Sequence, residues 1–168
     1  MIVLVEGPDG SGKTTLCSYL VERGFKYIHL SKTKNVYNLY DELIDQLKYS
    51  LDFDDVVIDR AYISNIVYSN VFNDSRYIDI HHLCEMNDLV DVIVLAIPSN
   101  KEKYLKRFEN LLSSRNELYK DMEKVYDEFK SRNSFKFLLQ DKNVFTYDID
   151  KISEKEIENF ADEELLKC

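Results

Sequence analysis

A cluster of glycines near the start of the chain is the feature that most restricts its fold. Three of the four glycines lie within six residues, at Gly7, Gly10 and Gly12. An apolar run over residues 2–5 precedes them, and a helical pattern over residues 13–23 follows. A backbone that turns this tightly between a strand and a helix needs residues without a side chain. The segment therefore predicts a strand–loop–helix unit whose backbone N–H groups point at a ligand.

The loop sequence also specifies the ligand. Gly7-Pro8-Asp9-Gly10-Ser11-Gly12-Lys13-Thr14 matches the pattern G-x-x-x-x-G-K-S/T, which binds the phosphates of a nucleoside triphosphate. We expect Lys13 to reach the β- and γ-phosphates of ATP and Thr14 to offer its hydroxyl to Mg²⁺. A glycine turn that merely joins a strand to a helix is the alternative interpretation. The loop residues expected to bind ATP are Gly7, Asp9, Gly10, Ser11, Gly12, Lys13, Thr14 and Thr15.

Strand and helix patterns alternate along the whole chain. The expected strands cover residues 2–5, 25–30, 55–59, 90–97 and 143–147. The expected helices cover residues 13–23, 35–50, 99–132 with a break near 113–114, and 152–166. This alternation favours an α/β fold in which right-handed crossovers place helices on both faces of a parallel sheet. We predict one P-loop NTPase domain over residues 1–168, with about five parallel strands and its ligand site at their carboxyl ends.

Composition limits the partners. The 22 Lys and Arg against 31 Asp and Glu give a net charge of −9, which argues against a DNA polymer as the main partner. No run approaches the roughly 20 apolar residues of a membrane helix, so we expect no membrane partner. Cys17, Cys84 and Cys168 lack metal-ligand spacing and are odd in number, which is typical of a reducing compartment. With no basic leader before the first strand, the expected location is the cytoplasm.

A second candidate motif follows the third expected strand. The apolar run Val56-Val57-Ile58 ends at Asp59, a carboxylate of the Walker B kind that can hold Mg²⁺ directly or through water. An aspartate that caps the next helix is the alternative. The chain contains no N-K-x-D segment, with which a GTPase would read guanine. His29, His81 and His82 are expected to be structural or exposed.

The two motifs resemble those of the thymidylate kinases. The segment from Glu6 to Thr15 resembles the phosphate loop of that family. Asp59-Arg60-Ala61-Tyr62-Ile63-Ser64-Asn65-Ile66-Val67-Tyr68-Ser69 is similar to the family's segment D-R-Y/F-x-x-S-S/N-x-x-Y-Q/S. The resemblance implies a P-loop nucleotide kinase, and the short chain fits a compact phage, viral or bacterial-type member.

The resemblance also implies roles for individual residues. Asp9 would contact the 3′-hydroxyl of a deoxynucleotide, and Arg60 would hold the acceptor phosphate. Asn65 and Tyr68 would line the base and sugar pocket, and Ser64 lies one helical turn before Tyr68 on the same face. Core packing is the alternative for Tyr68. The expected catalytic residues are Lys13, Asp59, Arg60 and Arg115, the acceptor-binding residues are Asp9, Lys32, Asp59, Arg60, Ser64, Asn65 and Tyr68, and the metal-binding residues are Thr14 and Asp59.

A lid arginine is the third element that the resemblance implies. Members of the family carry it either in the phosphate loop or in a mobile lid, and position 10 of this chain is a glycine. We therefore expect a small helical lid over about residues 106–118, with Arg115 as the first candidate and Arg107 as the second for binding ATP phosphates. Two arginines on a solvated helix face are the alternative.

The sequence departs from the family pattern in the region that would bind the acceptor. The family usually has an arginine-proline segment after its second strand, whereas this chain has no arginine between Arg23 and Arg60. Lys32 or Lys34 would have to replace it, as point charges without the bidentate geometry of arginine. The identity of the base therefore stays open.

The leading prediction is transfer of the γ-phosphoryl group of ATP to a deoxynucleoside monophosphate, dTMP or a modified pyrimidine nucleotide. One alternative is a hydroxyl acceptor, either a deoxynucleoside or hydroxymethyluracil in phage DNA, with Asp59 as general base. The other is a nucleotide-binding regulator without transferase activity. Because related enzymes are often dimers, a homodimer through the apolar face of residues 62–72 is a further expectation by analogy.

Overall fold

The computed structural model describes residues 1–30, 41–45, 55–73, 79–111, 116–151, 153–160 and 162. Within these residues the chain forms a five-stranded sheet in which every neighbouring pair of strands is parallel, in the order β2-β3-β1-β4-β5. The predicted parallel sheet is confirmed, since each strand lies where the sequence places one. The strands are β1 (Ile2–Glu6), β2 (Lys26–His29), β3 (Val56–Asp59), β4 (Val92–Ala96) and β5 (Asn143–Tyr147).

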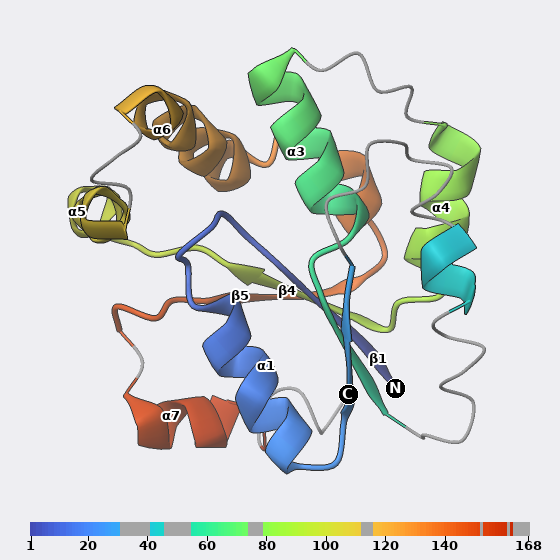
Figure 1. The fold of residues 1–168 in the computed structure, drawn as a ribbon. Coiled ribbons are helices and arrows are strands. Elements are labelled where there is room, and N and C mark those ends of the chain that lie inside the picture. Colours follow the sequence, from blue (N-terminus) through green and yellow to red (C-terminus); the bar gives the residue numbers. More distant parts are fainter. Residues whose placement is uncertain are drawn as a thin grey trace.

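Helices cover both faces of the sheet, as Figure 1 shows: α1 and α7 lie on one face, and α3, α4 and α6 lie on the other. None of the helices in the described part has the length and hydropathy that a membrane-spanning segment requires. The helices are α1 (Lys13–Glu22), α3 (Tyr62–Phe72), α4 (Ile80–Asp88), α5 (Lys101–Leu111), α6 (Asn116–Ser131), the short 3₁₀ helix η1 (Lys136–Leu139) and α7 (Glu154–Asn159).

The predicted helices are found with different completeness. The helix expected over residues 13–23 is α1, and the one expected over residues 99–132 includes α5 and α6. The break expected near residues 113–114 lies outside the described part. Of the helix expected over residues 35–50, only residues 41–45 are described, and they are helical. The last helix, α7, begins close to its expected start, and most of the residues after it lie outside the described part.

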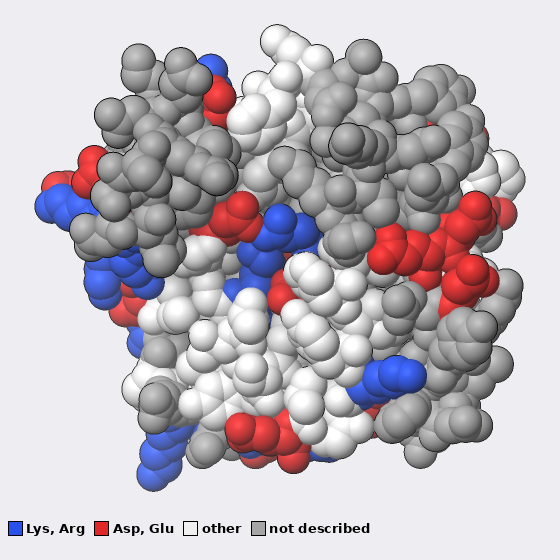
Figure 2. All heavy atoms as spheres, in the orientation of Figure 1, with Lys and Arg blue, Asp and Glu red and all other residues white. Residues whose placement is uncertain are grey.

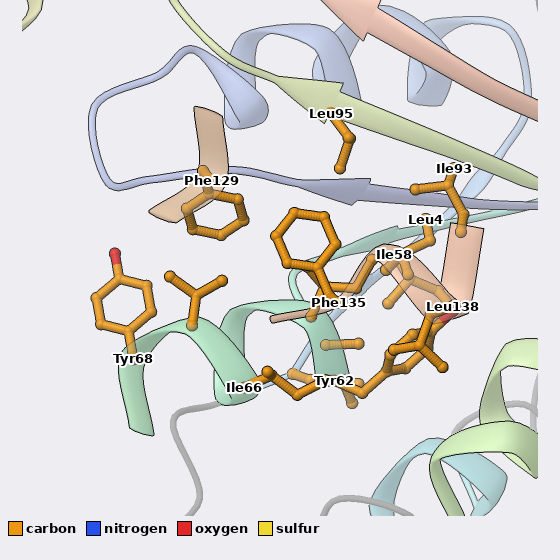
Figure 3. Close-up of a cluster of buried hydrophobic side chains, with 14 of the residues drawn as sticks. Leu4, Ile58, Tyr62, Ile66, Tyr68, Ile93, Leu95, Phe129, Phe135 and Leu138 are labelled. Atoms are coloured by element: carbon orange, nitrogen blue, oxygen red, sulfur yellow. The ribbon is translucent and has the colours of Figure 1, made fainter. Parts of the chain in front are cut away.

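Alternating residues of the strands divide the core into two layers. Leu4, Ile58 and Ile93 point toward the layer of α3 and α6, whereas Val3 and Val57 point toward α1 and α7. Because both faces are covered, the central strands β1, β3 and β4 are apolar at almost every position, whereas the edge strands β2 and β5 carry polar residues. Figure 3 shows the larger layer, with Leu4, Ile58, Ile93 and Leu95 of the sheet facing Tyr62 and Ile66 of α3 and Phe129 of α6.

The strand order determines where a ligand can bind. β1 lies in the middle of the sheet, and the chain continues from it to strands on both sides. In open α/β sheets, this change of direction opens a crevice at the carboxyl ends of the strands. The glycine-rich loop follows β1 and the second motif follows β3, and Val5 of β1 is in register with Asp59 of β3. The fold therefore brings the two sequence motifs to one edge of the sheet.

Candidate active site

The backbone of the glycine-rich loop has the conformation that the sequence predicts. Gly7, Gly10 and Gly12 have φ angles of 155°, 73° and 90°. A side chain at Gly7 would place a Cβ atom 2.2 Å from the carbonyl oxygen of Ala96, and one at Gly12 would lie 2.4 Å from Cδ1 of Ile149. Since α1 begins after Gly12 without a side-chain cap, the first N–H groups of this helix are available to an anion.

Lys13 folds back onto this loop. Its Nζ donates to the carbonyl oxygens of Gly7 at 2.9 Å and Pro8 at 2.7 Å, and the residue is 6% exposed. Burial, with a contribution from the nearby charge of Arg60, lowers the pKa of Lys13 from 10.5 to about 8. The neutral carbonyls therefore do not compensate fully for the water that the ammonium group has lost. A phosphate would supply the missing negative charge.

Arg60 joins the second motif to the loop. Its guanidinium forms an ion pair with Asp9, 51 residues earlier, and lies over the Tyr68 ring at 5.7 Å from the ring centroid. The Tyr68 hydroxyl accepts a hydrogen bond from the Asp9 backbone N–H at 3.2 Å. Burial alone would raise the pKa of Asp9, but the charges of Arg60 and Lys13 hold it below its ordinary value. Asp9 is therefore ionised at neutral pH and fixes the position of Arg60.

Asp59 occupies the floor of the site and is buried. Its Oδ2 accepts hydrogen bonds from the Tyr27 hydroxyl at 2.9 Å and the Thr14 hydroxyl at 3.4 Å, and Nδ1 of His29 lies 3.7 Å away. Burial and the bond to Asp59 raise the pKa of Tyr27, so this phenol stays protonated and keeps donating. Oδ1 of Asp59 is buried without a hydrogen-bond partner in the described part of the chain.

The residues expected to hold Mg²⁺ suit that ion. Thr14 and Asp59 present a hydroxyl and a carboxylate side by side, and Oδ1 of Asp59 has coordination capacity left. Mg²⁺ prefers oxygen ligands and is commonly held by one or two protein groups together with substrate phosphates and water. No group of three or more His, Cys, Asp or Glu among the described residues forms a complete metal site. An ion here would therefore depend on phosphate oxygens.

These residues line a pocket of about 390 Å³. Figure 2 shows Lys and Arg atoms gathered near the middle of this face, between α1 and α3, with acidic atoms beside them. Although the net charge of the protein is −9, three cations, Lys13, Arg60 and Arg107, line this pocket beside two carboxylates. The lining residues are Asp9, Gly10, Gly12, Lys13, Thr14, Thr15, His29, Asp59, Arg60, Arg107 and Ile149.

Arg107 is the lid candidate that the structure describes, and it lines this pocket from α5. Its guanidinium lies 3.2 Å from Oδ2 of Asp150, and Nζ of Lys103, one turn earlier on α5, lies 3.0 Å from Oδ1 of the same carboxylate. Arg115 lies outside the described residues, as do Lys32 and Lys34. Of the expected lid, residues 106–111 belong to α5 and residues 116–118 to α6.

The expected acceptor-binding residues of α3 have partners within the protein. The Ser64 hydroxyl is buried and donates to Oε2 of Glu6. Asn65 donates from Nδ2 to the Ala61 carbonyl oxygen at 3.3 Å. Tyr68 packs against both motifs, as described above. Their proposed contacts with an acceptor stay predictions.

Sequence reasoning missed four residues of the site. Tyr27 and His29 lie two residues apart on β2, so their side chains point to the same face of the sheet. His29 is in register with Asp59. Comparing the ends of the second and third strands would have revealed this pairing. Ile149 and Asp150 follow β5, and only the strand order brings Ile149 to the pocket and Asp150 to Arg107. The sequence predicts a structural or exposed His29, and the structure places it half-exposed in the pocket wall.

The sheet order and the glycine loop between β1 and α1 define the P-loop NTPase fold, as the sequence predicts. No family model matches the sequence, and no curated protein sequence matches it either.

Solved structures of nucleotide-binding proteins share the fold. The YorR protein of Bacillus subtilis, in complex with phosphorylated GDP, aligns with a TM-score of 0.66 at 21% identity over 95% of this chain and 92% of that one. The deoxyadenosine kinase of M. mycoides with bound dCTP aligns with a TM-score of 0.64 at 15% identity over the whole of both chains. Its complex with dATP gives the same TM-score and identity over 99% of this chain.

Proposed function

We propose that this protein transfers the γ-phosphoryl group of ATP to a small nucleotide acceptor, in the first place a deoxynucleoside monophosphate such as dTMP or a modified pyrimidine nucleotide. The observation that carries the proposal is the convergence of Lys13, Arg60 and Arg107 on one pocket above the phosphate loop. A protein that only bound ATP would need the loop and Lys13, but not a second cation held by the loop's own carboxylate. The deoxyadenosine kinase that shares the fold supports phosphoryl transfer as the class of reaction.

In the proposed reaction, different residues would bind the donor phosphates and the metal ion. Backbone N–H groups of the loop and of the start of α1 would hold the donor phosphates, and Lys13 would exchange the carbonyls of Gly7 and Pro8 for phosphate oxygens. Thr14 and Asp59 would hold Mg²⁺, which neutralises charge on the phosphates when bound. Phosphoryl transfer depends mainly on positioning and charge neutralisation, so these groups need no covalent role.

Arg60 would bind the acceptor phosphate. Its ion pair with Asp9 and its contact with the Tyr68 ring fix the guanidinium before any ligand arrives. An acceptor phosphate is ionised at neutral pH, so no strong general base is required. In this proposal Asp9 retains the contact with the sugar 3′-hydroxyl that the thymidylate-kinase resemblance implies. Asn65 would lie at the base, and Lys32 or Lys34 would add charge at the acceptor phosphate.

A hydroxyl acceptor is the second candidate, because of the unpaired Oδ1 of Asp59. A buried carboxylate oxygen without a hydrogen-bond partner in the described part can accept the proton of an attacking hydroxyl. Tyr27 and Thr14 occupy only Oδ2, so Oδ1 is the atom for this role. A deoxynucleoside, or hydroxymethyluracil in DNA, would then be the acceptor. The deoxyadenosine kinase with the same fold supports the deoxynucleoside form.

The experiment that tests the proposal is ADP release from Mg²⁺–ATP with a panel of acceptors. The panel holds dTMP, dUMP, hydroxymethyl-dUMP, dCMP, dGMP, thymidine, deoxyadenosine and hydroxymethyluracil-containing DNA. Turnover with a monophosphate supports the first candidate and identifies the base, whereas turnover only with a hydroxyl acceptor transfers the proposal to the second. ATP binding without turnover on any acceptor would contradict both and favour a nucleotide-binding regulator.

Arg60→Ala gives the residue-level test, and Arg23→Ala is its matched control. Arg23 follows α1 at the end opposite the phosphate loop and pairs with the exposed Asp162. The helix of 10 residues between Lys13 and Arg23 separates the control from the site by about 15 Å. Loss of an arginine at the surface should leave turnover unchanged, whereas loss of Arg60 should remove it.

A further inference from the structure

Glu6, the last residue of β1, is a buried carboxylate to which the proposed reaction gives no task. It is 0% exposed. Its Oε1 accepts the backbone N–H of Ala61 at 2.8 Å, and its Oε2 accepts the hydroxyl of Ser64. Burial raises the pKa of Glu6, and the bonds from Ser64 and Ala61 offset this only in part. A carboxyl group kept out of water at such a cost calls for a reason.

The contacts of Glu6 lie at the start of α3. This helix begins at Tyr62, and the residue before it, Ala61, has no side chain that could accept a hydrogen bond from the first turn. Glu6 reaches over from β1 and supplies the acceptors instead. The positive end of the helix dipole in turn favours negative charge at this position. One side chain therefore ties the end of β1 to the start of α3.

Arg60 lies between these two fixed points and has an unusual backbone. Its φ angle is 71°, in the left-handed region that a residue with a side chain adopts only when its surroundings impose it. The Arg60 N–H donates to the Val5 carbonyl oxygen at 3.0 Å, and the next N–H along the chain, of Ala61, donates to Glu6. Val5 and Glu6 of β1 thus accept hydrogen bonds from the N–H groups of Arg60 and Ala61, which flank the Cα atom of Arg60.

This backbone conformation directs the side chain of Arg60. From it the guanidinium reaches Asp9 of the phosphate loop and the ring of Tyr68. Glu6 is directly followed by Gly7, the first residue of that loop. The element that places the donor phosphates and the element that places Arg60 are therefore fixed to the same two residues of β1.

We infer that Glu6 is a positioning residue, which holds the Arg60 backbone in its left-handed conformation so that the guanidinium lies over the phosphate loop. The effect of Glu6 on catalysis rests on the proposed function, in which Arg60 binds the acceptor phosphate. The hydrogen bond from Ala61 to Oε1 does the positioning, so the length of the side chain matters more than its charge.

Two substitutions separate length from charge. Glu6→Gln keeps the length and an oxygen that accepts the Ala61 N–H, but it removes the charge and the second oxygen, which accepts from Ser64. Glu6→Asp keeps the charge but withdraws the carboxylate by one methylene group. Asp79→Ala is the matched control, since Asp79 caps another helix, α4, by accepting the His81 N–H at 2.8 Å.

The first readout is steady-state kinetics on the folded fraction of each variant. We expect Glu6→Asp to lower kcat/KM for the acceptor about 10- to 100-fold, the range for a displaced substrate-positioning group, with the Kd for ATP changed less than about 2-fold. Glu6→Gln and Asp79→Ala should retain kcat/KM within about 3-fold, because neither disturbs the position of Arg60. If Glu6→Asp keeps its acceptor kinetics, or if Glu6→Gln loses them as Glu6→Asp does, the inference is overturned.

A second readout does not need activity. Hydrogen exchange of the Ala61 amide, followed by NMR, should accelerate in Glu6→Asp and stay slow in Glu6→Gln and Asp79→Ala. A wild-type protein that turns over no acceptor would contradict the proposed function, and these exchange rates would still test the positioning of Arg60. Equal exchange of the Ala61 amide in the wild type and Glu6→Asp would overturn the inference directly.

Discussion

Lys13 should make the stability of the ligand-free protein depend on alkaline pH. The buried ammonium group has a pKa of about 8 in the folded protein, against an ordinary value of 10.5. At 1.36 kcal/mol per pKa unit, this lowering corresponds to a cost of about 3 kcal/mol for keeping the charged lysine in the loop. Below pH 8 the folded and unfolded chains both carry the proton, so the full cost is present.

The sign of the effect follows from proton binding. Between about pH 8 and pH 10.5 the unfolded chain still binds the proton that the folded protein has released, so the free energy of unfolding rises with pH. Lys13→Met keeps the length of the side chain but has no proton to release. From pH 7 to pH 10, the wild type should therefore gain about 2.5 kcal/mol of stability relative to Lys13→Met.

Urea unfolding at 25 °C, followed by circular dichroism at both pH values, measures this difference. Comparing the two proteins cancels groups that both contain, such as Tyr27 and Tyr68, whose pKa values burial raises. At pH 7 the ligand-free Lys13→Met should be at least as stable as the wild type, while its affinity for ATP falls. If the free energy of unfolding changes equally with pH in the two proteins, the claim that burial destabilises the charged form of Lys13 is refuted.

Two further predictions concern the loop and the α5 cation pair. Gly7→Ala should lower the free energy of unfolding by about 3 kcal/mol or more, since it adds a collision with the β4 backbone to the strain of positive φ, and ATP binding should be lost. The control is Gly24→Ala, where φ is 95° and nothing lies within 4 Å of the new Cβ. In urea unfolding, Gly24→Ala should lower the free energy of unfolding by only about 1 to 2 kcal/mol. Equal losses of stability in the two variants would contradict the role of the collision. Asp150→Asn releases Arg107 from its ion pair, and because this pair is partly exposed we expect ATP to bind only about 2- to 5-fold more tightly in a calorimetric titration. Unchanged or weaker binding would show that the Asp150 contact does not restrain Arg107.

The sheet and the phosphate loop were predictable because local sequence determines them. An unbroken apolar run such as Val56-Val57-Ile58 places apolar side chains on both faces of a strand. This pattern is typical of a strand that is covered on both sides. Each of Gly7, Gly10 and Gly12 has a positive φ angle, which a glycine adopts more readily than any other residue. Such features depend on near neighbours in the chain, so the sequence alone carries them.

The rest of the site depends on contacts between distant segments. His29 meets Asp59 through the register of β2 and β3, and Asp150 meets Arg107 through the position of β5 in the sheet. Glu6 at the end of an apolar strand looks like an exposed loop residue until α3 is placed against it. Patterns of hydrophobic residues predict the elements, but the pairing of their ends follows only from the assembled fold.

Transfer of labelled phosphate from [γ-³²P]ATP to an acceptor tests the central claim most directly. With Mg²⁺ present, the wild type and Arg23→Ala should place the label on a deoxynucleoside monophosphate or a deoxynucleoside, and Arg60→Ala should do so at least about 100-fold more slowly if the acceptor is a monophosphate. Label that stays on ATP with every acceptor, in a protein that binds ATP, would contradict the assignment of this site to phosphoryl transfer.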